Sequence, residues 1–401
     1  MVLIDFTMEN FKSFKTETTL SAEVGERLSK YKRTNTLDIG RTAVLKSLLI
    51  FGANGAGKSN LLAGIKTMQQ MVLNNPAKAT DALPATPFLL DADSGNAETR
   101  FAVDFKQGNA EYRYEFSYDQ KTIQHEALIK VHGNRETVYF ERVGQKFLTL
   151  PSALTEVAER TKANTLFLFM AQQNNDAAAI AVMTWFAEDL VFVADFDEAE
   201  IPEELAVLVR NKRVKQQLLR FLHFADFNIV DSDLLEGDRP QLLMGHKVYD
   251  TDGQYTGKDK KMTLTSESRG TRQLLLMALS MINAKLTGDG KTLLVDGFGD
   301  SLHLALSQAL VKIFNFAANQ NQVILTTHDL PLLDSALRVD QIYLVEKGFQ
   351  GISELRSIFD FRDSRNTSRQ GISYMKRYIE GRFGATPIID ADGMLTSLMD
   401  L

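Results

Sequence analysis

The residues best suited to chemistry lie at positions 52–59, which have the form G-x-x-x-x-G-K-S. An apolar segment, Ser47–Phe51, precedes this run, and a helical pattern follows it. Glycines let the backbone curl so that successive N–H groups face phosphate oxygens. Lys58 is then placed to reach the β- and γ-phosphates, and the Ser59 hydroxyl to hold Mg²⁺. A chance match somewhere in the chain is roughly a one-in-a-hundred event, so we expect a loop that binds a nucleoside triphosphate.

Further polar residues follow apolar strand patterns later in the chain. The apolar segment 292–296 ends in the carboxylate of Asp296, and the apolar segment 323–329 delivers His328 near its carboxyl end. Ligands in open α/β sheets bind outside the carboxyl ends of the strands. We therefore expect Asp296 and His328 to lie near the metal site at Ser59. A plain alternative for His328 is an ordinary polar loop residue.

Composition and charge exclude several classes of protein. The 401 residues are 44% hydrophobic and 24% charged, and the net charge of −6 gives no global nucleic-acid signature. The chain has no cysteine, which excludes disulfides, thiolate metal sites and cysteine nucleophiles and fits a reducing cytosol. No apolar run approaches the roughly 20 residues of a membrane span. We expect a cytoplasmic protein without a membrane partner.

The elements that must position these residues are visible in the hydrophobic patterns. Period two over 88–141 predicts an antiparallel β lobe, and 153–222 is mostly helical. The polar stretch 237–261 predicts a mobile hairpin or loop. From 271 onward, alternating strand and helix patterns predict a parallel sheet with covering helices. No heptad pattern is sustained, so no long coiled coil is expected. The expected division is 1–75, ATPase lobe I; 76–150, β lobe; 151–235, helical insertion; 236–350, ATPase lobe II; and 351–401, a tail docked on the head.

Taken together, these motifs resemble an ABC-class ATPase of the SMC/RecF-like branch. The run 52–59 resembles its Walker A loop, 268–272 its signature, 292–296 its Walker B strand and 300–303 its D-loop, while His328 resembles the switch histidine. The closing stretch YMKRYIEGRFGATP, with TTHDLPLLD, is similar to a narrower group, the RloA-like and AbiL-type ATPases of bacterial abortive-infection and restriction-linked islands. The resemblance implies an α/β P-loop ATPase head that binds ATP and Mg²⁺.

The resemblance also implies a shared active site. In the family, the signature of one protomer caps the γ-phosphate held by the other, so two heads close around two nucleotides. A helix N-terminus suits that task because its free N–H groups favour an anion. The alternative for Ser268 is an ordinary helix N-cap. The expected nucleotide-binding residues are Gly52, Ala53, Asn54, Gly55, Ala56, Gly57, Lys58, Ser59, Asn60, Ser268 and Gly270, and the expected metal ligands are Ser59 and Asp296.

The pattern breaks at Gly297, where the class normally has a glutamate that polarises the attacking water. Glycine offers no base. The candidate catalytic residues are therefore Asp300 and His328, with slow hydrolysis expected, although Asp300 also suits a D-loop structural role or the N-cap of a helix from Ser301. The implied function is an ATP-dependent dimer that regulates a partner effector, a nuclease or toxin, in anti-phage defence. The alternatives are a RecF-like DNA-repair ATPase, which leaves nucleic acid open as a partner, and a non-hydrolysing scaffold locked by ATP.

Overall fold

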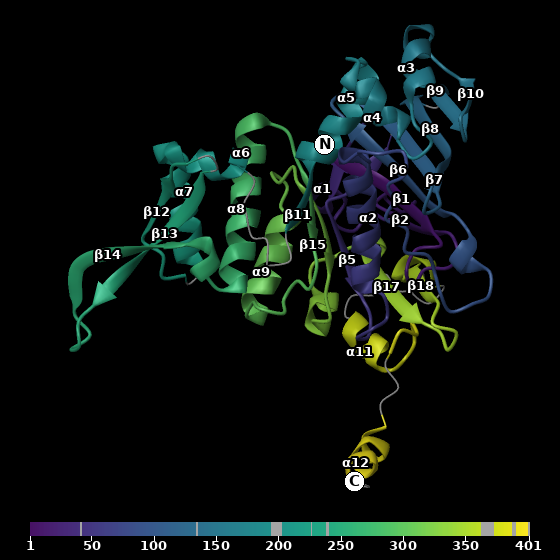
Figure 1. Ribbon diagram of the computed structural model, residues 1–401. Coiled ribbons are helices and arrows are strands. Elements are labelled where there is room, and N and C mark those ends of the chain that lie inside the picture. The colour runs from purple at the N-terminus through teal and green to yellow at the C-terminus, as the bar shows by residue number, and fades with distance from the viewer. Residues whose placement is uncertain are drawn as a thin grey trace.

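The computed structural model describes residues 1–40, 42–133, 135–193, 203–225, 227–237, 240–361, 373–386 and 390–399. Two large sheets make up the body, and a smaller sheet projects from it (Figure 1). The helix α2 (Lys58–Leu73) contributes its buried side chains to a core shared with the antiparallel sheet and one face of the parallel sheet. A second core lies on the other face of the parallel sheet, where α8 (Arg269–Thr287) and α9 (Leu304–Phe314) pack.

The parallel sheet carries the predicted phosphate loop. Its strand order is β11-β15-β16-β5-β17-β18, and only β18 runs antiparallel to its neighbour. Every residue of the central strands β5, β15 and β16 is buried, as expected for strands covered on both faces. The strands are β5 (Ser47–Phe51), β11 (Leu190–Val193), β15 (Thr292–Val295), β16 (Gln322–Thr326), β17 (Ile342–Lys347) and β18 (Ser353–Ser357).

The antiparallel sheet is larger than the expected β lobe. Its order is β10-β9-β8-β7-β6-β1-β2, so the first two strands of the chain belong to it. The expected boundary between 1–75 and 76–150 therefore does not follow the sheets. The reason is that β1 pairs with β6 along its length while Phe6 and Met8 are buried beneath it. The strands are β1 (Val2–Glu9), β2 (Thr18–Ser21), β6 (Thr99–Gln107), β7 (Ala110–Tyr118), β8 (Ile123–His132), β9 (Arg135–Val143) and β10 (Lys146–Thr149).

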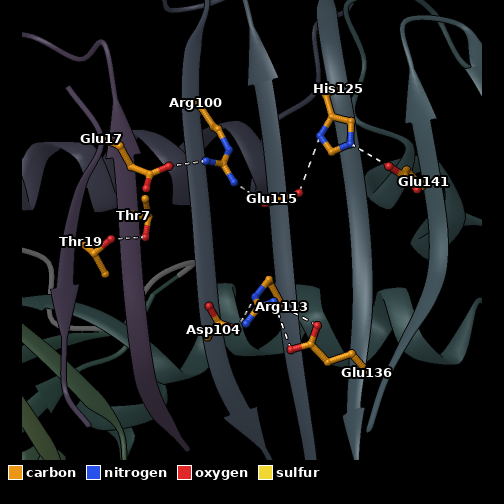
Figure 2. Close-up of polar contacts among 10 residues, drawn as sticks. All are labelled: Thr7, Glu17, Thr19, Arg100, Asp104, Arg113, Glu115, His125, Glu136 and Glu141. Atoms are coloured by element: carbon orange, nitrogen blue, oxygen red, sulfur yellow. Dashed lines mark hydrogen bonds and ion pairs between the residues drawn. The ribbon is translucent and has the colours of Figure 1, made fainter. Parts of the chain in front are cut away.

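One face of this sheet carries a network of charged groups (Figure 2). Arg100 bridges Glu17 at 2.7 Å and Glu115 at 2.8 Å, and Arg113 contacts Asp104 at 2.8 Å. His125 lies between Glu115 and Glu141. Arg113 also forms an ion pair with Glu136 at 3.2 Å. The alternation of these side chains with the buried aromatic residues explains the period-two pattern of the sequence.

The segment 151–235 differs from the expected helical insertion. It contains α3 (Thr155–Arg160), α4 (Phe167–Gln173), α5 (Ala177–Thr184), α6 (Glu203–Ala206) and α7 (Lys212–Phe224), but β11 lies between them. β11 pairs in parallel with β15 at the edge of the core sheet. The segment is therefore part of the head, because its short apolar strand completes the parallel sheet.

The predicted hairpin or loop at 237–261 belongs to a three-stranded sheet that projects from the body (Figure 1). Its strands are β12 (Asp231–Leu235), β13 (Gln241–Tyr249) and β14 (Tyr255–Thr263). The chain passes from β14 through a short turn into α8, the longest helix in the described residues at 19 residues. The described part of the chain therefore contains no long coiled coil, as the sequence predicts. The remaining short elements are α1 (Lys32–Asn35), β3 (Thr36–Asp38) and β4 (Ala43–Leu45).

The C-terminal segment from residue 351 contributes a strand to the core sheet and two short helices. β18 is part of the core sheet, and α11 (Tyr374–Ile379) is fixed by Ser373, whose hydroxyl donates to Asp334 at 2.6 Å. Tyr378 and Phe383 are buried, whereas α12 (Ala391–Met399) buries no residue and lies apart in Figure 1. None of the helices in the described ranges combines the length and apolar character needed to span a bilayer.

Candidate nucleotide-binding site

The glycine-rich loop lies between the fully buried strand β5 and the start of α2. Hydrogen bonds from residues distant in the sequence hold its backbone in place. The Ser353 hydroxyl on β18 donates to the Ala56 carbonyl at 2.6 Å and lies 2.8 Å from the Ser13 hydroxyl, which also accepts from the Asn60 side chain at 2.8 Å. These contacts fix the loop's backbone before any ligand binds, which lowers the ordering cost of binding.

Lys58 lies over the loop that it would serve. Its Nζ donates to the carbonyl oxygens of Gly52 at 2.7 Å and Ala53 at 3.0 Å. Burial lowers the pKa of Lys58, and the nearby carboxylates of Asp296 and Asp300 oppose that shift. The loop carbonyls thus hold the ammonium group where a triphosphate would replace them as its partner.

A hydroxyl and a carboxylate converge at the carboxyl ends of neighbouring strands. Ser59 Oγ donates to Asp296 Oδ1 at 3.2 Å. Thr326, the last residue of β16, donates to the same carboxylate oxygen and accepts from the Gly297 N–H at 2.9 Å. Mg²⁺ binds oxygen ligands of this kind, usually with one or two carboxylates and the substrate phosphates. The donor set at Ser59 and Asp296 therefore fits the expected ion.

The departure at Gly297 has a structural counterpart. Gly297 has φ +63°, and a Cβ added there would lie 2.7 Å from Asp300 Oδ2. The carboxylate of Asp300 thus occupies the space that a side chain at position 297 would enter. His328 Nδ1 lies 3.5 Å from Asp300 Oδ1, and burial raises the pKa of the adjacent Asp329. The expected helix N-cap role of Asp300 is wrong, because α9 begins at Leu304 with His303 as its N-cap.

These groups surround one cavity of about 330 Å³. The expected residues that line it are Asn54, Gly55, Gly57, Lys58, Ser59, Asn60, Asp296, Asp300 and His328. Gly52, Ala53 and Ala56 contribute backbone carbonyls beside it rather than lining it. The cavity also includes Arg269, Gly297, Thr326 and Thr327. Sequence reasoning assigned no role to Arg269, although it lies inside the signature, or to the two threonines that precede His328.

The signature residues Ser268 and Gly270 do not line this cavity. Ser268 is exposed, and its hydroxyl caps α8 by accepting from the Thr271 N–H at 3.1 Å. Gly270 is buried, and a Cβ added there would lie 2.6 Å from the Ser301 carbonyl. The start of α8 is thereby packed against the loop that carries Asp300.

Comparison with protein-family models gives a match over residues 48–335 to a family described as "AAA domain, putative AbiEii toxin, Type IV TA system". The matched region contains the phosphate loop, the signature, Asp296 and His328. The chain belongs to this family. The assignment confirms a P-loop ATPase head that resembles abortive-infection ATPases, and such heads generally use ATP and Mg²⁺.

The chain is also similar to solved ATPase heads. A structure titled "Crystal structure of the SmcHead bound to the C-winged helix domain of ScpA" shares 12% identity, with 89% of this chain and 97% of that chain covered and a TM-score of 0.45. The "SMC head domain from Thermotoga maritima" shares 14% identity, with 89% and 99% covered and a TM-score of 0.39. A search of curated proteins finds no match.

Proposed function

We propose that two copies of this chain close around two molecules of ATP and hydrolyse them slowly, and that this cycle regulates a partner effector. The observation that carries the proposal is the split between the two halves of the site. Lys58, Ser59 and Asp296 surround one cavity, whereas Ser268 is exposed at a helix start outside it. A twofold pair lets the Ser268 turn of each chain meet the nucleotide of the other.

Hydrolysis in this proposal depends on Asp300. A water oxygen bonds to the γ-phosphorus as the bond to the β–γ bridging oxygen breaks, and ADP takes that electron pair. Asp300 accepts a proton from the water, since its carboxylate fills the space beside Gly297. His328, which lies 3.5 Å from Asp300, orients that carboxylate. Bound Mg²⁺ would neutralise charge on the phosphates.

The proposed effector is a nuclease or toxin encoded separately, and the proposed setting is anti-phage defence in the cytoplasm. The family description, which names a toxin and a toxin–antitoxin system, supports this setting. Within the described part of the chain, no cluster of three or more metal-ligating side chains suggests a nuclease centre. A ligand shifts a conformational equilibrium only through its different affinity for the two states, and ATP shared between protomers supplies such a difference.

The first experiment measures ATP turnover and molecular mass for the wild type, Lys58→Ala and Asp300→Ala. We expect ATP to convert monomer to dimer in the wild type and in Asp300→Ala but not in Lys58→Ala. We expect turnover only in the wild type. A wild type that stays monomeric with ATP contradicts the proposal.

A second candidate is a scaffold that binds ATP without hydrolysing it, favoured by the glycine at position 297. It predicts an ATP-dependent dimer with no phosphate release by the wild type. The RecF-like alternative predicts that duplex DNA stimulates turnover. The acidic side chains on the outer face of the antiparallel sheet, shown in Figure 2, do not favour phosphate binding there.

A further inference from the structure

Two consecutive residues at the start of α8 have different surroundings. Ser268 is exposed and does not line the nucleotide cavity, whereas Arg269 is half-buried and lines it together with Lys58 and Asp300. Ser268 is the N-cap residue, with extended backbone (φ −62°, ψ 156°), and Arg269 is the first helical residue of α8. The side chain of Arg269 lines its own chain's cavity, whereas that of Ser268 does not.

The position of Arg269 within the cavity is set by short distances around Gly297. A Cβ added to Gly297 would lie 3.4 Å from an Arg269 guanidinium nitrogen and 2.7 Å from Asp300 Oδ2. The guanidinium group thus lies at the same end of the cavity as the proposed general base. In the proposed hydrolysis the γ-phosphate lies at this end, where preorganised donors stabilise the charge that develops on it.

The start of α8 is held by the Ser268 cap and by close packing on the loop that carries Asp300. Ser268 caps the helix by accepting from the Thr271 N–H at 3.1 Å. Gly270 packs so closely on the Ser301 carbonyl that an added Cβ would lie 2.6 Å from it. These contacts hold the start of α8, and with it Arg269, against the loop that carries Asp300.

We infer that Arg269 acts in cis on the γ-phosphate of its own chain's ATP, while the neighbouring Ser268 acts in trans on the partner's ATP. This inference rests on the proposed ATP dimer and names a further residue that acts in that site. A guanidinium group binds phosphate oxygens through paired N–H donors, which suits Arg269 for the role. Each complete site would then draw Lys58 and Arg269 from one chain and Ser268 from the other.

The test mixes inactive variants in pairs and measures ATP turnover. Arg269→Ala is expected to lower turnover alone by about 10³-fold or more, as for phosphate-stabilising arginines, and Ser268→Ala by about 10²–10³-fold, as for loss of one preorganised hydrogen-bond donor. Lys58→Ala provides a chain with an empty site. In a random mixture of Arg269→Ala and Ser268→Ala, half of the dimers are mixed and each of these holds one complete site, so rescue restores about a quarter of wild-type turnover.

The pairs give opposite results for action in cis and in trans. If Arg269 acts in cis, Arg269→Ala mixed with Ser268→Ala recovers turnover, because the Ser268→Ala chain keeps its own Lys58 and Arg269 and receives the partner's Ser268. Arg269→Ala mixed with Lys58→Ala stays inactive. The reverse pattern overturns the inference. The first mixture also shows that the Arg269→Ala chain folds and dimerises.

The remaining outcomes separate this inference from the proposed function. Ser268→Ala mixed with Lys58→Ala should recover turnover if the site is shared, and failure of this mixture contradicts the proposed dimer itself. Wild-type turnover by Arg269→Ala alone overturns the role of Arg269 and leaves the dimer intact. Lys285→Ala is the matched control, since it removes an exposed cation from the last turn of the same helix.

Discussion

Replacing Gly297 with alanine tests whether the Asp300 carboxylate is the working base. Gly297 has φ +63°, where a residue with a Cβ costs about 1 kcal/mol. The new Cβ would lie 2.7 Å from Asp300 Oδ2, so the carboxylate must move by several tenths of an ångström. Since a misplacement of about 1 Å can cost about 100-fold in rate, we expect turnover to fall by about 10- to 100-fold.

The matched control is Gly253→Ala in the turn between β13 and β14. Gly253 has φ +77° and no atom within 4 Å of an added Cβ, so this variant bears the same backbone strain without the clash. Each variant should lower the thermal midpoint by about 1–2 °C. Only Gly297→Ala should slow the single-turnover release of phosphate from ATP, by about 10- to 100-fold.

A double variant completes the test. If both changes act through one carboxylate, Gly297→Ala combined with Asp300→Ala should be no slower than Asp300→Ala alone. Wild-type turnover by Gly297→Ala refutes the reasoning, because the carboxylate cannot stay in place beside the added Cβ. Fully additive losses in the double variant would also contradict it.

Three further predictions follow from other contacts. Lys58→Ala should abolish ATP binding measured by calorimetry without lowering the thermal midpoint by more than about 2 °C, since the Lys58 ammonium group donates to loop carbonyls at the edge of an open cavity. Glu126→Ala should lower the free energy of unfolding by about 3–5 kcal/mol, because Glu126 and Arg142 are fully buried and paired at 2.7 Å; Glu141→Ala, on the exposed face, should cost under about 1 kcal/mol. Burial raises the pKa of Asp104 to about 6, so the folded chain binds a proton on this carboxyl more tightly than the unfolded chain does. The ionised carboxylate therefore lowers the free energy of unfolding above about pH 6. This destabilisation is lost as the pH falls toward 4. Relative to wild type, Asp104→Asn should therefore gain about 2 kcal/mol in unfolding free energy between pH 4.5 and pH 8, and an unchanged difference across this range would contradict the assignment.

Much of the site was predictable because its motifs are local. The phosphate loop needs only a run of residues between one strand and one helix, and the apolar strands that end at Asp296 and His328 are visible as short buried patterns. The carboxyl ends of parallel strands meet at one edge, so proximity to Ser59 followed from topology alone. The family's signature motif likewise marked the start of α8.

What only the tertiary structure decided is which distant segments pair and which way adjacent side chains face. A periodic pattern reports that a strand has a buried side, but it does not name the neighbouring strand. The pairing of β1 with β6 and of β11 with β15 therefore lay beyond the sequence. The same holds for Arg269 in its own chain's cavity, because the start of α8 and the loop after β15 lie apart in the sequence. Asp300 lies only three residues from Gly297, but the direction of its carboxylate depends on how their shared loop folds.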